Sequence, residues 1–398
     1  MSNKLEVFTL KNSYGMELEV SNFGATILSL KVPNKKGSLT NVVVGLEQAE
    51  DYLTAPYTDV SLFLGSSIGR YAGRISKGKF EIQSKVYPIP NANGVHLHGG
   101  TGFDKKFWNL KSQTSNAVVL TYTSQHLEEG YPGELEVEAL FEITENNCLI
   151  VSYSATTDEA TPVNLTCHPY FNLNGEGSIL EHELWINSTK HLEVDKQLIP
   201  TGIIVESENT PFDYSKSSRI NKPNFIGFDD TFVMGLGQLK AKLNSAKTGI
   251  EMKVYANEPA MVIYTPKQFP ELNFKNQLGE GPFPTICFEP QNFPDAPNNH
   301  HFPNSILQPG EIYSNKIVFE FSIPHPTLSK KAFNPMQKGF MYLTTIIDVY
   351  SRFIAGWGLS TSLNPAPSLN VGKKTVDEYG TPTILNSDQG SQFTCKVT

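Results

Sequence analysis

Apolar and polar residues alternate with a period of two along much of the first 323 residues. Alternation of this kind puts every second side chain on one face of a strand, so each run predicts a strand with one buried face. Turn residues separate the runs, and helical periodicity is scarce. The pattern predicts a mostly β protein, an antiparallel β-sandwich-like body with few helices. The runs are NVVVGL from 41, AVVLTYTS from 117, LEVEALFEIT from 135, CLIVSYSATT from 148, GIEMKVYAN from 249 and NKIVFEFSI from 315.

The pattern changes after Ile323. The next stretch, PHPTLSKKAFNPMQKG, contains three prolines and no periodicity, which is typical of a linker. Beyond it, FMYLTTIIDVYSRFIAGWGLS is one continuous β-branched and aromatic run. We therefore expect a body over residues 1–325, a linker over 326–338 and a separate C-terminal region over 339–398.

Composition fits a folded protein with a sizeable core, since 39% of the 398 residues are hydrophobic. No window approaches the length of a membrane span, and the first residues contain no apolar signal-like segment, so we expect a soluble, cytoplasmic protein without a membrane partner. The four cysteines form no CxxC pair, which favours buried free thiols over a disulfide framework or a zinc-ligand set.

Charge divides the chain in the same place. The net charge is −8, from 32 Lys and Arg against 40 Asp and Glu. Residues 330–398 contain seven basic and four acidic side chains, a balance of +3, which leaves 25 basic and 36 acidic side chains, or −11, for the remainder. An acidic body is a poor candidate for binding nucleic acid through its phosphates.

Two segments of the body combine basic side chains with glycines, which would let a ligand approach closely. SIGRYAGRISKG contains Arg70 and Arg74; a surface salt bridge is as good an interpretation for Arg70 as ligand binding, and less so for Arg74. GVHLHGGTGFDKKFW contains His96 and His98, which would share one face of a strand and could in principle bind a metal. No third ligand follows at a matching spacing.

Three further segments carry candidate acid–base groups. LTCHPYFNLNG contains His168, either a satisfied core histidine or a proton donor in the wall of a sugar pocket. IGFDDTF contains Asp229 and Asp230, which could simply cap a turn. TICFEPQNFPDAPNNHHFPN contains Glu289 among aromatic residues that would exclude water and raise its pKa toward the range of a general base. From residue types alone, a polar pocket without catalysis would need nearly the same set.

Taken together, GRYAGRISKGKF, LHGGTGFDKKFW, TPVNLTCHPYFNLNG, GFDDTF and CFEPQNFPDAPN resemble, in this order, the motifs of the aldose 1-epimerases, also called galactose mutarotases. The resemblance covers roughly residues 5–323. It implies a large twisted antiparallel β-sandwich with the sugar in an open cleft. It also implies an isomerase that interconverts the α and β anomers of free hexoses such as galactose and glucose, without metal or cofactor. A hexose-6-phosphate 1-epimerase and a non-catalytic carbohydrate-binding protein stay open as alternatives.

The resemblance also implies roles for individual residues. Glu289 matches the base that takes the proton of the anomeric hydroxyl, and His168 matches the acid that protonates the ring oxygen. An imidazole suits this task because its unperturbed pKa is about 6.5. The expected substrate-binding residues are Arg74, His98, Asp229 and Tyr170.

Two positions depart from the family pattern. Gly73 stands where many members have Asn before the motif arginine, and Glu258 stands where some relatives carry an amide. We expect both to influence which hexose is preferred without removing the proton-transfer pair. The preferred aldose and the oligomeric state are left open.

The C-terminal region resembles a different family. YLTTIIDVYSRFIAGWGLS and YGTPTILNSDQGSQFT are similar to the RNase H-like α/β catalytic core of transposases and integrases, in which two Asp and one Glu hold two metal ions. Asp348 and Asp388 match the aspartates, but no Glu occurs among the ten residues after Asp388, and STSLNPAPSLNVGKK between them is poor helix material. We expect an incomplete, inactive fragment without functional nucleic-acid binding.

Overall fold

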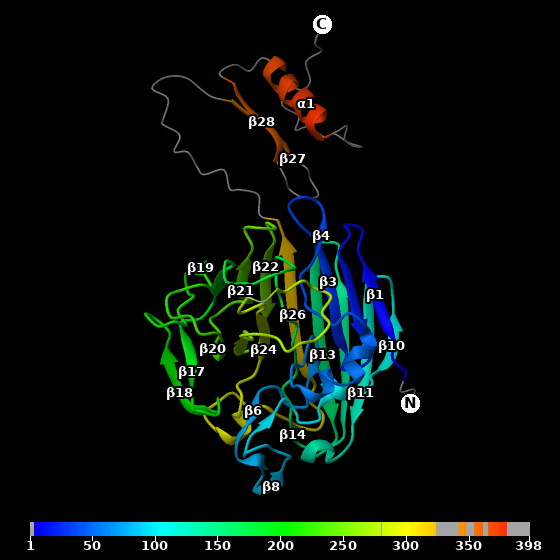
Figure 1. Ribbon diagram of the computed structural model, residues 1–398, viewed down its shortest axis with the longest axis vertical. Coiled ribbons are helices and arrows are strands. Elements are labelled where there is room, and N and C mark those ends of the chain that lie inside the picture. Colours follow the sequence, from blue (N-terminus) through cyan, green and yellow to red (C-terminus); the bar gives the residue numbers. More distant parts are fainter. Residues whose placement is uncertain (1–3, 280, 324–341, 348–353, 361–364, 380–398) are drawn as a thin grey trace. The chain divides into compact units, whose positions relative to one another are not determined.

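The computed structural model describes residues 4–279, 281–323, 342–347, 354–360 and 365–379 (Figure 1). Contacts divide the chain into two units, Met1–His325 and Pro326–Thr398. In the described part of the chain, no helix is long and apolar enough to cross a membrane.

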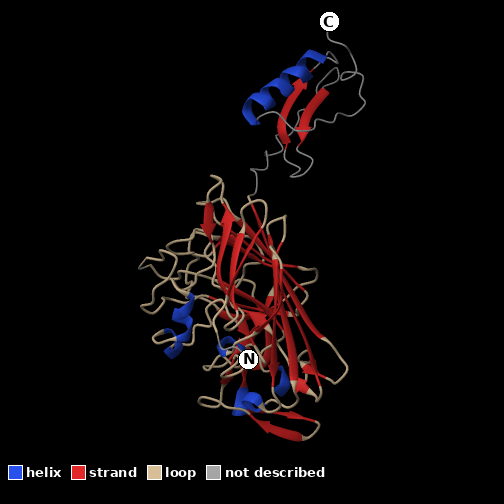
Figure 2. Ribbon diagram, turned by 90° about the vertical axis from the view of Figure 1, so that its right-hand side faces the viewer, coloured by secondary structure: helices blue, strands red, loops and turns tan. Residues whose placement is uncertain are grey.

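The first unit is built around a nine-stranded antiparallel sheet, whose long strands run side by side (Figure 2). Its strands, in spatial order, are β10 (Asn109–Gln113), β11 (Ala117–Ser124), β12 (Leu135–Ile143), β13 (Cys148–Thr157), β26 (Tyr313–Ser322), β22 (Glu251–Ala256), β21 (Leu239–Asn244), β16 (Glu183–Ile186) and β19 (Ser218–Arg219).

A second, five-stranded antiparallel sheet carries much of the chemistry described below. Its order is β18 (Pro200–Glu206), β17 (Lys190–Val194), β20 (Asp229–Val233), β23 (Ala260–Tyr264) and β24 (Cys287–Gln291). A four-stranded sheet consists of β1 (Val7–Lys11), β2 (Glu17–Ser21), β3 (Thr26–Pro33) and β4 (Leu39–Asn41).

Short two-stranded pairings complete the described strands of this unit. They are β5 (Ser67–Ile68) with β15 (Thr166–Cys167), β6 (Arg74–Ile75) with β9 (His96–Leu97), β7 (Lys79–Ile82) with β8 (Lys85–Pro88), and β14 (Thr161–Pro162) with β25 (Ile306–Leu307). The helical segments described in this unit are all 3₁₀ turns: Ala49–Leu53, Tyr57–Asp59, Ser76–Gly78, Phe103–Lys105, Glu128–Gly130 and Ala296–Asn298.

The core is shared between the sheets. Alternate residues of β12, among them Leu135, Val137 and Phe141, belong to the same buried apolar cluster as Ile263 of β23 and Phe288 of β24. Fully burying one such side chain stabilises the fold by about 1.5–3 kcal/mol. The predicted mostly β, sandwich-like fold is confirmed, and β11 and β13 span the runs AVVLTYTS and CLIVSYSATT residue for residue.

One predicted strand is wrong. NVVVGL from Asn41 is not a regular strand: β4 ends at its first residue, and the run then makes isolated bridges from Val43 to Phe171 and from Leu46 to Phe274. All residues from 42 to 46 are buried, so the run lacks the alternation of a strand with one exposed face.

The second unit contains an antiparallel pair, β27 (Tyr342–Ile347) and β28 (Ile354–Ser360), and a helix, α1 (Pro365–Tyr379). The helix corrects the expectation that this stretch is poor helix material. Its prolines lie in the first turn, where backbone N–H groups have no intrahelical partner. A Cβ on Gly356 would lie 1.9 Å from Oγ1 of Thr375, so the helix packs closely on β28 because the strand has glycine there.

The remaining predictions for this region are not tested by the structure. Residues 326–338, expected to form a linker, and the two aspartates Asp348 and Asp388 lie outside the described residues.

Candidate active site

Strand alternation in the five-stranded sheet defines the face that carries the site. On β24, Phe288 joins the core, whereas Glu289 projects from the other face. Val262 pairs directly with Glu289 across the strands, and Tyr264 pairs with Asp229 on β20. Because cross-strand partners lie on the same face, Glu289, Val262, Tyr264 and Asp229 share one surface of this sheet.

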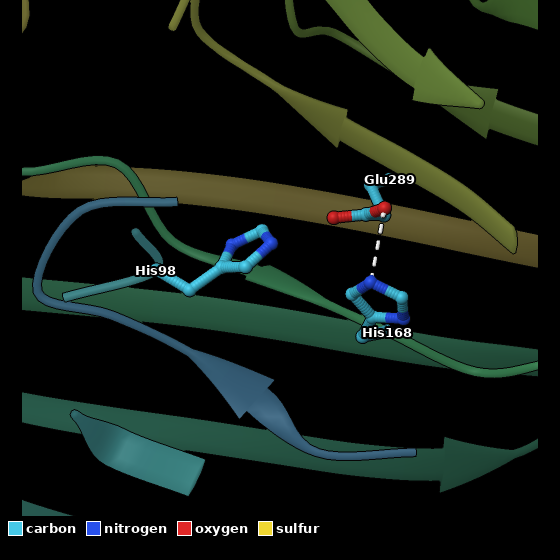
Figure 3. A group of neighbouring side chains, drawn as sticks. All are labelled: His98, His168 and Glu289. Atoms are coloured by element: carbon cyan, nitrogen blue, oxygen red, sulfur yellow. Dashed lines mark ion pairs between the residues drawn. The ribbon is translucent and has the colours of Figure 1, made fainter. Parts of the chain in front are cut away.

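His168 reaches this surface from the position that directly follows the short strand β15. The Thr166 hydroxyl donates to the Pro290 carbonyl at 2.9 Å, which ties β15 to β24. As a result, Nε2 of His168 lies 3.3 Å from Oε1 of Glu289 (Figure 3). His168 is 4% exposed and Glu289 1% exposed, so the contact is almost completely desolvated.

Burial dominates the proton affinity of this pair. It lowers the pKa of His168 to about 4 and raises the pKa of Glu289 well above its usual range. The negative charge of Asp229 raises the Glu289 pKa further, whereas the nearby Arg74 guanidinium lowers it. Each group thus favours its neutral form, in which the pair holds one proton, on Glu289.

His98 is held in one orientation by reciprocal contacts with Gly73. Its backbone N–H donates to the Gly73 carbonyl at 2.9 Å, and the Gly73 N–H donates to Nδ1 of His98 at 3.2 Å. With Nδ1 accepting, the neutral ring carries its proton on Nε2. Burial lowers the pKa of His98 well below its usual range, as does the neighbouring His168. His98 is therefore a neutral hydrogen-bond donor.

The expectation that His96 and His98 share a strand face is wrong. The strand ends at Leu97, and His98 adopts a φ of +51°, which turns it out of the strand direction. His96 is 1% exposed, its Nδ1 lies 2.5 Å from the Pro90 carbonyl oxygen, and its ring lies beside that of Tyr131.

His98, His168 and Glu289 nevertheless form a compact group, with one potential ligand atom from each within 4.8 Å of the others (Figure 3). Metal ligation needs a free imidazole lone pair. In His98 the Nδ1 lone pair accepts the Gly73 N–H, and Nε2 carries the proton. This donor set fits hydrogen bonding to hydroxyl groups and does not fit a three-ligand metal site.

Arg74 and Asp229 form a two-pronged ion pair beside this group. Nη2 of Arg74 lies 3.0 Å from Oδ2 of Asp229, and Nη1 lies 3.5 Å from Oδ1. The side chains are 21% and 29% exposed, so each keeps polar edges that a ligand can reach. The structure thus brings Arg74, His98, His168, Asp229 and Glu289 into one site.

Comparison with known proteins agrees with this geometry. The family model for aldose 1-epimerase matches residues 6–320. The chain belongs to the aldose 1-epimerase family. It is therefore an isomerase of carbohydrate metabolism. The model for an integrase core domain matches residues 331–398.

Individual relatives cover nearly the same part of the chain. The galactose mutarotase of Rattus norvegicus is 37% identical over 334 residues, 80% of this chain and 94% of its own. The aldose 1-epimerase of Escherichia coli is 32% identical over 333 residues, 79% of this chain and 94% of its own.

Two solved structures share the fold. An aldose epimerase homologue from C. elegans has a TM-score of 0.76 at 26% identity and covers 81% of this chain and 100% of its own. Galactose 1-epimerase from Lactobacillus acidophilus has a TM-score of 0.71 at 28% identity and covers 82% of this chain and 97% of its own.

The aromatic residues around the epimerase site include two that sequence reasoning missed. Phe63 lies edge-on to His98, with ring centroids 4.7 Å apart, and Tyr264 lies edge-on to His168 at 5.9 Å. Tyr264 could have been found from the alternation of β23, whereas nothing in the sequence around Phe63 marks it.

Tyr170, expected to bind substrate, lies behind the imidazole ring of His168. Its ring stacks on His168 with centroids 5.0 Å apart, its hydroxyl donates to the Leu62 carbonyl, and the residue is 1% exposed. The neighbouring Phe171 points into the core, with its ring 4.9 Å from that of Phe319.

Arg70, for which a surface salt bridge was one interpretation, is 2% exposed and donates to the backbone carbonyls of Ser124 and Pro132. Glu258, expected to influence sugar preference, lies between β22 and β23, where its charge acts on Lys240 and Tyr313. Burial raises the Glu258 pKa to about 7.

Gly73 has a structural reason to be glycine. Its φ is +82°, and a Cβ there would lie 3.0 Å from the Pro294 side chain.

Proposed function

We propose that this protein interconverts the α and β anomers of free aldoses, with galactose and glucose as substrates. The observation that carries the proposal is the buried 3.3 Å contact between Nε2 of His168 and Oε1 of Glu289, next to Arg74, Asp229 and His98. Relatives named galactose mutarotase support galactose as a substrate.

In the proposed reaction, Glu289 takes the proton from the anomeric hydroxyl as the C1–O1 bond becomes a carbonyl. The bond between C1 and the ring oxygen breaks, and the ring oxygen takes the proton of His168. Rotation about C1–C2 then presents the other carbonyl face. On closure, the ring hydroxyl returns its proton to His168, and Glu289 returns its proton to O1, so that atoms and charges balance.

A pair that holds a single proton can carry out both steps although both groups are desolvated. Ring opening starts from ionised Glu289 and protonated His168, and closure starts from the form with both groups neutral. The two forms have the same net charge, so conversion between them requires no change in proton content.

Other side chains hold the sugar. Arg74, Asp229 and the Nε2–H of His98 bind its hydroxyl groups, while the faces and edges of Phe63 and Tyr264 cover its C–H surface. Tyr170 acts as a positioning residue, because it keeps the His168 ring in place without facing the sugar.

A hexose-6-phosphate 1-epimerase and a non-catalytic carbohydrate-binding protein are both less well supported. A hexose 6-phosphate would need a cation free to meet the phosphate, but Arg74 is paired through both terminal nitrogens with Asp229. A non-catalytic binding protein would not require a buried acid–base pair in direct contact.

Saturation transfer between the α and β anomeric protons of equilibrated sugar tests the function by NMR. We expect fast enzyme-dependent exchange for galactose and glucose and much slower exchange for galactose 6-phosphate. Exchange with the phosphate ester alone would overturn the free-sugar assignment, and no exchange with any of these sugars would overturn the epimerase function.

A further inference from the structure

Gln291 is a buried amide that the acid–base mechanism does not use. It lies two residues after Glu289 on β24, so strand alternation puts both side chains on the same face. Gln291 is 0% exposed, and neither its Oε1 nor its Nε2 has a hydrogen-bond partner among the described residues. A buried amide without partners is costly, and native proteins normally satisfy it.

The amide group lies beside the segment that carries two sugar-binding candidates. A Cβ placed on Gly73 would lie 3.1 Å from Nε2 of Gln291. Gly73 itself donates to His98 and directly precedes Arg74. The unpartnered amide is thus next to the groups proposed to hold the sugar.

The neighbours of Gln291 on its own sheet do not supply the missing partners. Its cross-strand partner on β23 is Ala260, a methyl side chain without polar atoms. The Pro294 ring approaches the same point beside Gly73 and has no side-chain donor or acceptor.

We propose that the Gln291 carboxamide binds a hydroxyl group of the sugar other than the anomeric hydroxyl, and so contributes to substrate specificity. The inference rests on the proposed epimerase function and adds a substrate-binding residue to it. A primary amide offers both a donor and an acceptor and carries no charge, which fits a neutral hydroxyl.

The test combines Gln291→Met with a series of sugars that each lack one hydroxyl. Methionine has a similar length but cannot form the hydrogen bonds. Gln113→Met, at an exposed position on β10, is the matched control. KM and kcat for galactose and for its 2-, 3-, 4- and 6-deoxy derivatives are measured for the parent and both variants, and thermal unfolding is followed in parallel.

We expect Gln291→Met to raise KM for galactose about tenfold, with a smaller effect on kcat, because one net hydrogen bond is lost. For one deoxy sugar the variant and the parent should have equal KM values, which identifies the hydroxyl group. The variant should unfold at a temperature no lower than the parent, since it buries no unpaired amide. Gln113→Met should leave KM, kcat and the unfolding temperature unchanged.

Two results would overturn the inference while leaving the epimerase function intact. One is an unchanged KM for galactose in Gln291→Met. The other is an equal rise in KM for galactose and for every deoxy sugar, together with a lower unfolding temperature. That result would show that the amide stabilises the fold and does not bind the sugar. A parent without epimerase activity on galactose would overturn both proposals.

Discussion

Nε2 of His168 and Oε1 of Glu289 lie 3.3 Å apart although Glu289 lies on β24 and His168 directly follows β15, which pairs with β5. Nearly all water is excluded from both side chains. We expect this desolvated pair, and not an isolated imidazole, to determine how the site responds to pH.

The pH dependence of kcat/KM should reflect this pair. Burial lowers the pKa of His168 to about 4, so the pair gains a second proton only near that pH, and Glu289 then cannot accept one. We expect enzyme activity to stay level through pH 6.5 and to fall only as the pH approaches 4. Buffer-corrected polarimetry measures the profile. An acid limb centred near 6.5 would mean that His168 titrates as an unperturbed imidazole.

Glu289→Gln should be inactive but at least as stable as the parent at neutral pH. Burial raises the pKa of Glu289 in the folded state. Above the usual pKa of glutamate, the unfolded chain therefore releases a proton that the native state still holds. The free energy of unfolding falls as the pH rises for this reason. The amide cannot ionise and avoids this loss. We expect a gain of about 1 kcal/mol in the free energy of unfolding at pH 7, measured by urea titration.

The advantage of Glu289→Gln should shrink as the pH is lowered and vanish below about pH 4, where the carboxyl group of the unfolded chain is also mostly protonated. A variant clearly less stable than the parent at pH 7 would show that ionised Glu289 stabilises the fold, contrary to the burial argument.

Arg74→Met and Asp229→Asn should each raise KM for galactose by about tenfold or more, because hydrogen bonds to charged groups contribute roughly 1.5–3 kcal/mol. Their effect on the unfolding temperature should be small, since a partly exposed ion pair contributes at most about 1 kcal/mol. The matched control is Arg219→Met, which breaks an exposed pair with Glu181. Equal KM changes in the control would show that the effect is not specific to the site.

Ending the chain after His325 should leave kcat and KM for galactose unchanged, because every residue of the proposed site lies in the unit Met1–His325. Steady-state kinetics and thermal unfolding of the shortened and full-length proteins make the comparison. Loss of activity in a shortened protein that still unfolds cooperatively would show that the second unit contributes to the epimerase reaction.

Much of the fold could be predicted from alternation alone where one strand face is buried and the other is solvated, as in β11 and β13. Alternation fails where both faces are buried, as at Val43, and it gives no information on α1. That helix packs closely on β28 through Thr375 and Gly356, a tertiary contact that no local propensity contains.

The site could be predicted only where its residues stand in local sequence motifs. His168, Glu289 and Arg74 stand in distinctive motifs, and the structure brings them together. Phe63 and Gln291 are marked only by their neighbours in space, since the edge-on contact with His98 and the proximity of the amide to Gly73 join segments far apart in the chain. Tyr170 was found, but its hydroxyl faces Leu62 and not the site.

The most direct test follows the optical rotation of freshly dissolved α-D-galactose and α-D-glucose with the parent protein and with Glu289→Gln and His168→Asn. We expect fast mutarotation by the parent and a loss of at least about a hundredfold in each variant, the range that a general acid or base contributes. A parent no faster than buffer, or a variant as fast as the parent, would contradict the assignment of His168 and Glu289 as the proton-transfer pair of an aldose 1-epimerase.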